Sequence, residues 1–177
     1  MGDSSGDVTE GIRASLARAA AQLAAAEAPD EAHAEYVPAR RVALLFARAP
    51  TMRPLGRVWR LGVLLLDSDG AAHTTGAITR AQHTGRPNHQ SVSAEARRAY
   101  RAAALKAGYA EGETVDFDTT PIDLDAVAAG DQAGPILIHD GEARVRWVAG
   151  AAPDAAVPLD AYLAERIRLL LNPPEGA

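Results

Sequence analysis

The stretch "PILIHDGEARVRWVA", residues 135–149, decides the fold. Asp140-Gly141 separates two arms that are rich in β-forming residues, and this dipeptide is typical of a two-residue hairpin turn. Such a turn sets the register, which places His139 opposite Glu142 and Ile136 opposite Val145. Residues 135–148 are therefore predicted to form an antiparallel hairpin.

A second hairpin is predicted over residues 57–80. Its first arm, residues 57–66, ends in a nearly continuous apolar run, as expected of a strand that is covered on both faces. The segment "DSDG" (67–70) has turn chemistry, with Gly70 available for a positive φ angle. The returning arm, 71–80, is richer in Thr and small residues, so we expect it to be more exposed to solvent.

One more strand is predicted near residues 113–118, "ETVDFD". Apolar and acidic residues alternate there, which is the pattern of a strand with one buried face. Val115 and Phe117 are expected to point inward, and Asp116 and Asp118 outward.

Three helices are predicted near residues 8–27, 93–107 and 158–171. Asp7 and Glu10 have the spacing of a capping box, and Ser93 is the expected N-cap of the second helix. Residues 38–48 are ambiguous. Their Ala, Leu and Arg content favours a helix, but the alternation of Val42, Leu44 and Phe46 would also suit a strand.

Together these elements predict an α+β fold with an antiparallel sheet of about five strands. No sharp linker divides residues 1–177, so we expect a single domain. Residues 1–28 have a narrow, Ala-rich apolar face, which suggests a peripheral or dimer-forming helix. The chain could belong to a high-GC genome, because 17 of its 18 basic residues are arginine and alanine is the commonest residue type.

Composition excludes several classes of protein. The chain has no cysteine, so disulfides and Cys-ligated metal centres are excluded. It has no apolar run that could span a membrane and no secretory signal pattern, so a cytoplasmic protein is expected. The net charge of −5 is unevenly spread: residues 51–110 carry 9 basic and 3 acidic groups, and residues 111–177 carry 4 and 13.

The polar loop "HTGRPNHQS", residues 83–91, is the first candidate site. His83 and His89 could transfer protons, and Arg86 with Arg80 could hold a carboxylate or phosphate. The loop leads into a predicted helix N-terminus, where anions often bind. The same residue types are also ordinary loop formers, so a solvated connection is the alternative.

The carboxylates of Asp116 and Asp118 are the second candidate, because neighbours on one strand face could share a cation or orient a histidine. Calcium-loop and zinc motifs are absent, so no metal and no cofactor are predicted. Nucleic acid is not a favoured partner, because the chain is acidic and poor in aromatic residues.

Two hypotheses about function follow. The first is a non-catalytic binding or assembly module that self-associates, because no catalytic signature is present. The second is an enzyme acting on a small molecule that carries phosphate or carboxylate, with His89, His83 and Asp118 in catalysis and Arg86 and Arg80 holding the anion.

Overall fold

The computed structural model describes residues 3–42, 46–85 and 91–174 of the chain. It confirms the α+β class, with helices and a mostly antiparallel sheet. In the described residues this sheet has seven strands rather than the predicted five or so, in the order β7-β8-β1-β4-β5-β6-β9, and β10, β11 and β12 form a separate smaller sheet. The chain divides into two compact units. Unit 1 comprises residues 1–30, 58–75 and 120–177, and unit 2 comprises residues 31–57 and 76–119.

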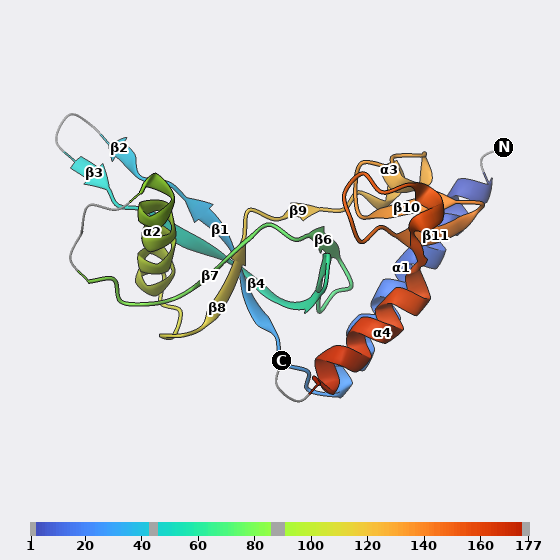
Figure 1. Ribbon diagram of the computed structural model, residues 1–177, viewed down its shortest axis with the longest axis horizontal. Helices are drawn as coiled ribbons and strands as arrows, with labels where there is room; N and C mark the ends of the chain where they lie inside the picture. The colour runs from blue at the N-terminus through green and yellow to red at the C-terminus, as the bar shows by residue number, and fades with distance from the viewer. Residues whose placement is uncertain (1–2, 43–45, 86–90, 175–177) are drawn as a thin grey trace. The chain divides into compact units, whose positions relative to one another are not determined.

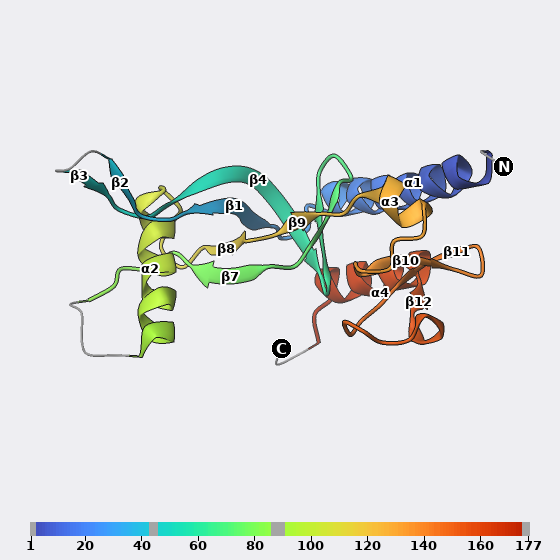
Figure 2. The ribbon, with the colours of Figure 1, turned by 90° about the horizontal axis from the view of Figure 1, so that it is seen from above.

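Unit 1 packs two long helices against short strands (Figures 1 and 2). Its helices are α1 (Asp3–Ala25), α3 (Leu124–Ala128) and α4 (Leu159–Leu171), with a 3-10 turn at Pro153–Ala155. Its strands are the end of β4 (Thr51–Leu61), β5 (Leu64–Asp67), β6 (Ala72–Thr74), β9 (Thr120–Pro121), β10 (Ile136–His139), β11 (Glu142–Val145) and β12 (Val157–Pro158).

The core of unit 1 collects the apolar faces of α1 and α4. Ile12, Leu16 and Leu23 of α1 and Leu163 and Ile167 of α4 are almost fully buried in one cluster. The apolar face of α1 is therefore covered by its own chain. This removes the reason for expecting residues 1–28 to form a dimer, and self-association stays a prediction.

The hairpin at Asp140-Gly141 is confirmed in the predicted register. Ile136 pairs with Val145 and His139 with Glu142. Asp140 and Gly141 have φ angles of 51° and 75°, and two successive positive φ angles define the type I′ turn that suits a twisted hairpin. The side chain of Glu142 forms its ion pair with Arg144, at 2.9 Å, rather than across the strands with His139.

The prediction of one hairpin over residues 57–80 was wrong in its details. The run 57–66 is divided by a tight turn at Gly62-Val63, and Leu61 pairs with Leu64 across it. Gly62 has a φ angle of 68°, which only glycine adopts readily. The turn at 67–70 is present and joins β5 to β6, but residues 77–80 form β7, which pairs with β8 instead. An apolar run long enough for one buried strand also fits two strands joined by a two-residue turn that contains a glycine.

Unit 2 is a sheet covered on one face by helix α2 (Val92–Lys106). The sheet consists of β7 (Ala77–Arg80), β8 (Thr114–Phe117), β1 (Glu31–Val37) and the start of β4. β7 and β8 are antiparallel, whereas β1 and β8 are parallel. The core between α2 and the sheet is rich in alanine: it consists of Ala32, Ala34, Met52, Ala81, Ala103, Ala104, Val115 and Phe117.

The preference for a helix over residues 38–48 was wrong. Strands β2 (Arg40–Val42) and β3 (Phe46–Arg48) form an antiparallel pair in which Val42 lies opposite Phe46. Helix propensity spans only about 0.7 kcal/mol per residue among ordinary residue types, so it is a weak preference that strand pairing overrides here. Leu44 lies outside the described residues.

The helix predictions were right in kind and were shifted at the ends. α1 begins at Asp3, four residues before the expected cap at Asp7, and the N-cap of α2 is Ser91 rather than Ser93. α4 matches the prediction closely. The sequence carries no clear strand signal in β1, because its Ala, His and Glu residues are not strong β formers.

Candidate functional site

A pocket of about 340 Å³ lies in unit 2 between the edge of the sheet and helix α2. Three arginines contribute to it, and we call it the arginine pocket. The sheet contributes Glu31 of β1, Thr114 of β8 and three residues of β7, namely Ile78, Thr79 and Arg80. Gln82 comes from the segment after β7, and α2 contributes Arg97, Tyr100 and Arg101.

Helix α2 presents two of these arginines because of its periodicity. Ala103 and Ala104 are buried against the sheet, while Arg97 and Arg101 are exposed. Residues four apart lie on the same side of a helix, so the two guanidinium groups face the same region. The ring of Tyr100 packs against Phe117, with centroids 4.8 Å apart, and fixes this part of the helix to the sheet.

The third arginine comes from the end of β7. Arg80 is exposed and pairs in register with Thr114, which also lines the pocket. Gln82 follows two residues later, where its backbone N–H donates a hydrogen bond to the carbonyl of Arg101 at 3.5 Å. This contact joins the segment after β7 to the middle of α2, and so brings Arg80 and Arg101 to one pocket.

Ion pairs among the described residues do not neutralise the charge of the arginine pocket. In the part of the chain that the structure describes, no salt bridge involves Arg80, Arg97 or Arg101. Other arginines of unit 2 are paired: Arg53 with Glu35 and Arg57 with Glu113. The pocket therefore holds three exposed positive groups and, among its described lining residues, a single carboxylate, that of Glu31.

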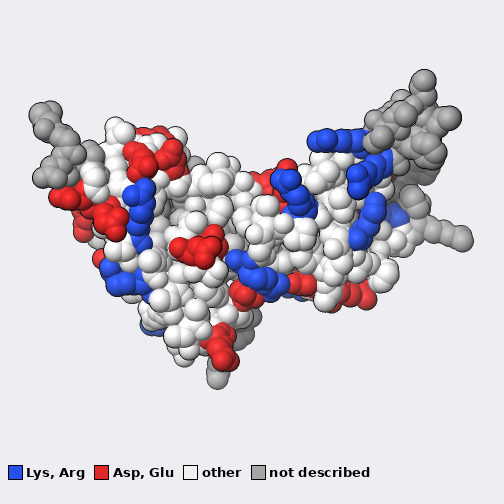
Figure 3. Space-filling view, turned by 180° about the vertical axis from the view of Figure 1, so that it is seen from behind, with Lys and Arg blue, Asp and Glu red and all other residues white. Residues whose placement is uncertain are grey.

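The two units also differ in total charge. Unit 2 has 11 basic and 7 acidic residues, a net charge of +4, whereas unit 1 has 7 basic and 16 acidic residues, a net charge of −9. Basic side chains gather over unit 2 on the face seen in Figure 3. An anion that approaches unit 2 meets a positively charged surface, which favours its association.

The structure brings together only some of the residues predicted from sequence. Arg80 lines the arginine pocket, and His83 is an exposed residue just beyond it in the chain. Arg86 and His89 lie outside the described residues. Asp118 lines a different pocket, and it follows the opposite end of β8 from the end that pairs with Arg80, about 14 Å away along the strand.

The expectation that Asp116 and Asp118 share an exposed strand face was wrong. Asp116 is fully buried. Asp118 lies beyond the end of β8 with a φ angle of 53°, so it does not continue the alternation of the strand. The alternation itself separates two faces correctly, but it cannot show that both faces of an interior strand are covered.

A buried histidine lies beside Asp116 and was not singled out from the sequence as a site residue. His33 of β1 is 4% exposed and is the register partner of Asp116 across the parallel pair β1–β8. Its Nε2 atom lies 2.7 Å from the Oγ1 atom of Thr119, within hydrogen-bonding distance. This bond ties the middle of β1 to the segment after β8.

Thr119 also lines the pocket that contains Asp118, together with Ala34, Glu35, Tyr36 and Leu55. Burial raises the pKa of Tyr36 above its usual value, and the neighbouring Tyr100 and Asp118 raise it further. Tyr36 is therefore a neutral hydroxyl at physiological pH. The acidic groups Glu35 and Asp118 make this pocket a poor receptor for an anion.

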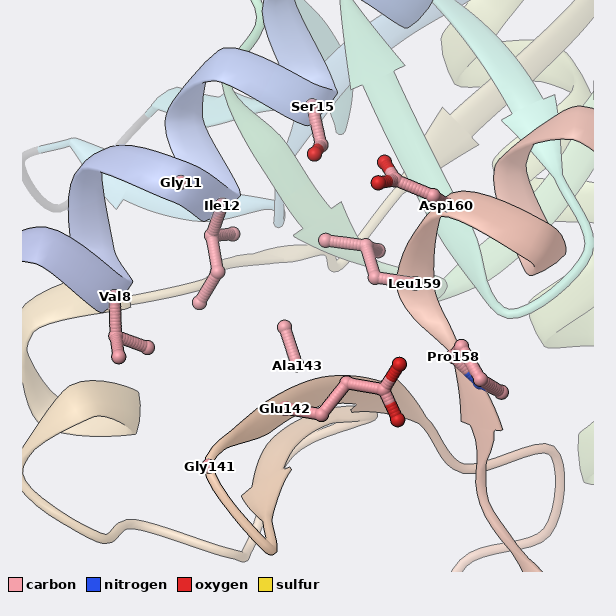
Figure 4. A pocket seen from close by; sticks show the side chains of 10 residues that line it. All are labelled: Val8, Gly11, Ile12, Ser15, Gly141, Glu142, Ala143, Pro158, Leu159 and Asp160. Carbon is pink, nitrogen blue, oxygen red and sulfur yellow. The ribbon is translucent and has the colours of Figure 1, made fainter.

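Unit 1 has a pocket of about 290 Å³ between α1, the β10–β11 hairpin and the start of α4 (Figure 4). Its walls are Val8, Ile12, Ala143, Pro158 and Leu159, with glycines at positions 11 and 141. Ser15 and Asp160 lie close together at one end, and Glu142 lies at the other.

Both carboxylates that line the unit 1 pocket already have cationic partners. Asp160 pairs with Arg18 at 3.4 Å, and Glu142 pairs with Arg144 at 2.9 Å. Arg18 also donates a hydrogen bond to the hydroxyl of Ser15 at 2.9 Å. The pocket in unit 1 thus has no unbalanced charge to attract an ion, in contrast to the arginine pocket.

Two kinds of site are not found in the described ranges. No group of three or more His, Asp or Glu side chains there is arranged to hold a metal ion. No helix in those ranges combines the length and the apolar character that crossing a membrane requires.

No protein-family profile, curated protein or solved structure matches the chain.

Sequence reasoning missed Arg97 and Arg101 as site residues. Both are exposed, off the face of α2 that is buried against the sheet. Their four-residue spacing and their position just after the loop that follows Arg80 were the available signals. Only the packing of β7 beside α2 shows that the three arginines line one pocket.

Proposed function

We propose that the chain is a non-catalytic binding module whose ligand carries phosphate or carboxylate and binds in the arginine pocket of unit 2. The observation that carries this proposal is the set of three arginines, Arg80, Arg97 and Arg101, that line one pocket without ion-pair partners in the described chain. Guanidinium groups bind carboxylate and phosphate through paired N–H donors, which makes arginine suited to this task.

The other lining residues support binding rather than chemistry. Gln82 and Thr114 are neutral hydrogen-bonding groups that can complete the contacts to an oxyanion. Tyr100 offers a ring against which a planar ligand group or a guanidinium can stack. Such a lining holds an anion in place but supplies no nucleophile that is activated by a neighbouring base.

An enzyme is the second candidate, and one observation favours it. Gln82 lines the arginine pocket and is followed directly by His83, so the loop 83–91 begins at this pocket. In this alternative, Arg80 and Arg86 hold the anion of a substrate while His83 or His89 transfers a proton. Hydrolysis of p-nitrophenyl phosphate that His89→Ala abolishes would favour the enzyme over the binding module.

Thermal-shift measurements test the binding function. The probes are potassium phosphate, tripolyphosphate and citrate, each compared with potassium chloride at the same ionic strength. A probe at 100 times its Kd should raise the free energy of unfolding by about 2.7 kcal/mol. Stabilisation by at least one probe, lost in the Arg97→Ala/Arg101→Ala variant and kept in Arg98→Ala, would support the proposal. Equal stabilisation of all three proteins would refute it.

Self-association belongs to the same proposal and is tested separately. Light scattering over a wide concentration range would detect a dimer. A mass that stays that of the monomer at every concentration would remove self-association from the proposed function while leaving anion binding in place.

A further inference from the structure

Strand β7 forms one edge of the sheet within the described residues. The strand order begins with β7, which pairs there with β8 alone. Ala81 shows which side of the chain faces β8: its N–H donates to the carbonyl of Glu113 at 2.9 Å, and its carbonyl accepts from the N–H of Gly112 at 2.8 Å.

Alternation along the strand then assigns the remaining backbone groups. In an antiparallel pair, every second residue exchanges hydrogen bonds with the partner strand. Because Ala81 faces β8, Thr79 and Ala77 also face it, and the N–H and C=O groups of Ile78 and Arg80 point to the outer edge. In the described part of the chain, neither residue has a backbone hydrogen bond outside the β7–β8 ladder.

Among the residues that the structure describes, nothing pairs with the outer edge of β7, so this edge can accept another strand, and its positive charge favours an acidic one. Protein edges are commonly protected by proline, by bulges or by charged side chains. β7 contains no proline, and its Ile78 side chain is 53% exposed. Arg80 is a charged side chain on the edge, but it repels only basic and not acidic strands.

The arginine pocket lies along the same edge. Its lining includes three consecutive residues of β7 (Ile78, Thr79 and Arg80) together with Arg97 and Arg101 of α2. A segment that paired with β7 would place its side chains beside these guanidinium groups. The open backbone edge and the unpaired positive charge therefore select one kind of occupant.

We infer that the ligand of the arginine pocket is an acidic, extended segment of a partner protein, which adds to the sheet as a strand beside β7. This inference rests on the proposed anion-binding function. Main-chain hydrogen bonds to Ile78 and Arg80 hold the segment, and its Asp or Glu side chains bind the arginines. The four residues of β7 span about 14 Å, so the contact takes four or five residues of the partner.

A second copy of this chain is a poor occupant of the edge. A symmetric dimer through β7 would place the same surface on both sides of the interface. Arg80, Arg97 and Arg101 of each copy would then meet those of the other, and like charges in close contact oppose association. An acidic segment meets no such repulsion.

Fluorescence polarisation with a labelled peptide tests the inference. The probe is fluorescein-Gly-Glu-Val-Glu-Val-Glu-amide, and the small-anion reference is citrate. Two further peptides carry one N-methyl group each, on the central Glu or on the neighbouring Val. Successive N–H groups of a strand point to opposite edges, so only one of the two methyl groups falls between the peptide and β7.

We expect one N-methyl peptide to bind at least tenfold more weakly than the parent peptide and the other to bind within about threefold of it. Binding should be lost in Arg97→Ala/Arg101→Ala and retained in Arg98→Ala, which removes one charge from α2 outside the pocket lining. If citrate competes with the peptides but both N-methyl peptides bind equally well, strand addition is wrong and the anion site stands.

Other results would overturn the inference in different ways. If neither citrate nor any peptide binds, the proposed function fails with it. Tighter binding of the oligonucleotide dT10 than of the peptide would assign the pocket to nucleic acid. A dimer that the peptide dissociates, seen by light scattering, would assign the edge to a second copy.

Discussion

The hydroxyl group of Tyr162 joins helix α4 to the β4–β5 turn, and its removal gives a quantitative test of how unit 1 is held together. The side chain is fully buried. Its hydroxyl donates a hydrogen bond to the carbonyl of Leu61 at 2.7 Å and accepts one from the N–H of Val63 at 2.9 Å. Tyr162→Phe removes both bonds and leaves two backbone groups of the turn without these partners.

The expected cost follows from these two bonds. Leaving a buried polar group unsatisfied costs about 1–3 kcal/mol. Leu61 is buried and Val63 is only partly buried, so we expect Tyr162→Phe to lower the free energy of unfolding of unit 1 by about 2–3 kcal/mol. With a urea dependence of about 2 kcal/mol per molar, the unfolding midpoint should fall by about 1 M or slightly more.

Tryptophan fluorescence in urea measures this change in unit 1 alone, because both tryptophans, Trp59 and Trp147, lie in that unit. Tyr109→Phe is the control for the substitution type: Tyr109 lies in unit 2, where its hydroxyl is buried without a hydrogen-bond partner among the described residues, so the tryptophan midpoint of unit 1 should not move. Removing this hydroxyl should be neutral or slightly stabilising for unit 2. A midpoint for Tyr162→Phe within 0.2 M of the wild type (about 0.4 kcal/mol at that slope) would refute the reasoning.

Three further predictions concern the same unit. Gly62→Ala should destabilise it by about 2–3 kcal/mol in urea unfolding, because a Cβ atom would lie 2.5 Å from the Tyr162 hydroxyl at a φ angle of 68°; an unchanged midpoint would contradict this. Asp123→Ala should cost about 1 kcal/mol, since the Asp123 carboxylate accepts hydrogen bonds from the first N–H groups of α3, and Asp123→Asn should recover most of the loss. Burial raises the pKa of the Tyr162 hydroxyl, so above pH 10 the unfolded chain loses the hydroxyl proton before the folded chain does. The free energy of unfolding should therefore fall as the pH rises, and it should fall less steeply in Tyr162→Phe. Parallel pH profiles of the two proteins would contradict this.

The parts of the fold that the sequence predicted are those set by local chemistry. Asp140-Gly141 fixes a hairpin and its register because few other turns accept two positive φ angles. The helix α4 was predicted because Leu159, Leu163 and Ile167 repeat with helical spacing and become buried. In both cases neighbours in the chain carry enough information.

The parts that were missed depend on partners distant in the chain. Strand β1 has weak β propensity and is held by its parallel pairing with β8, more than 80 residues away. Asp116 is buried although it alternates with the buried Val115 and Phe117, so both faces of β8 are covered, which the alternation of the strand cannot reveal. The candidate site was found only in part: Arg80 was singled out, but that it lines the same pocket as Arg97 and Arg101 depends on how β7 packs beside α2.

The central claim is that three arginines of unit 2 act together as an anion receptor. Isothermal titration of tripolyphosphate into the wild type, into each single Ala variant of Arg80, Arg97 and Arg101, and into Arg98→Ala tests it most directly. Each of the three pocket variants should bind at least tenfold more weakly, because it loses a charge-assisted hydrogen bond worth about 1.4 kcal/mol or more. Arg98→Ala should bind within about threefold of the wild type. Four equal losses would show that only the net charge of unit 2 matters, and no detectable binding to the wild type would contradict the claim outright.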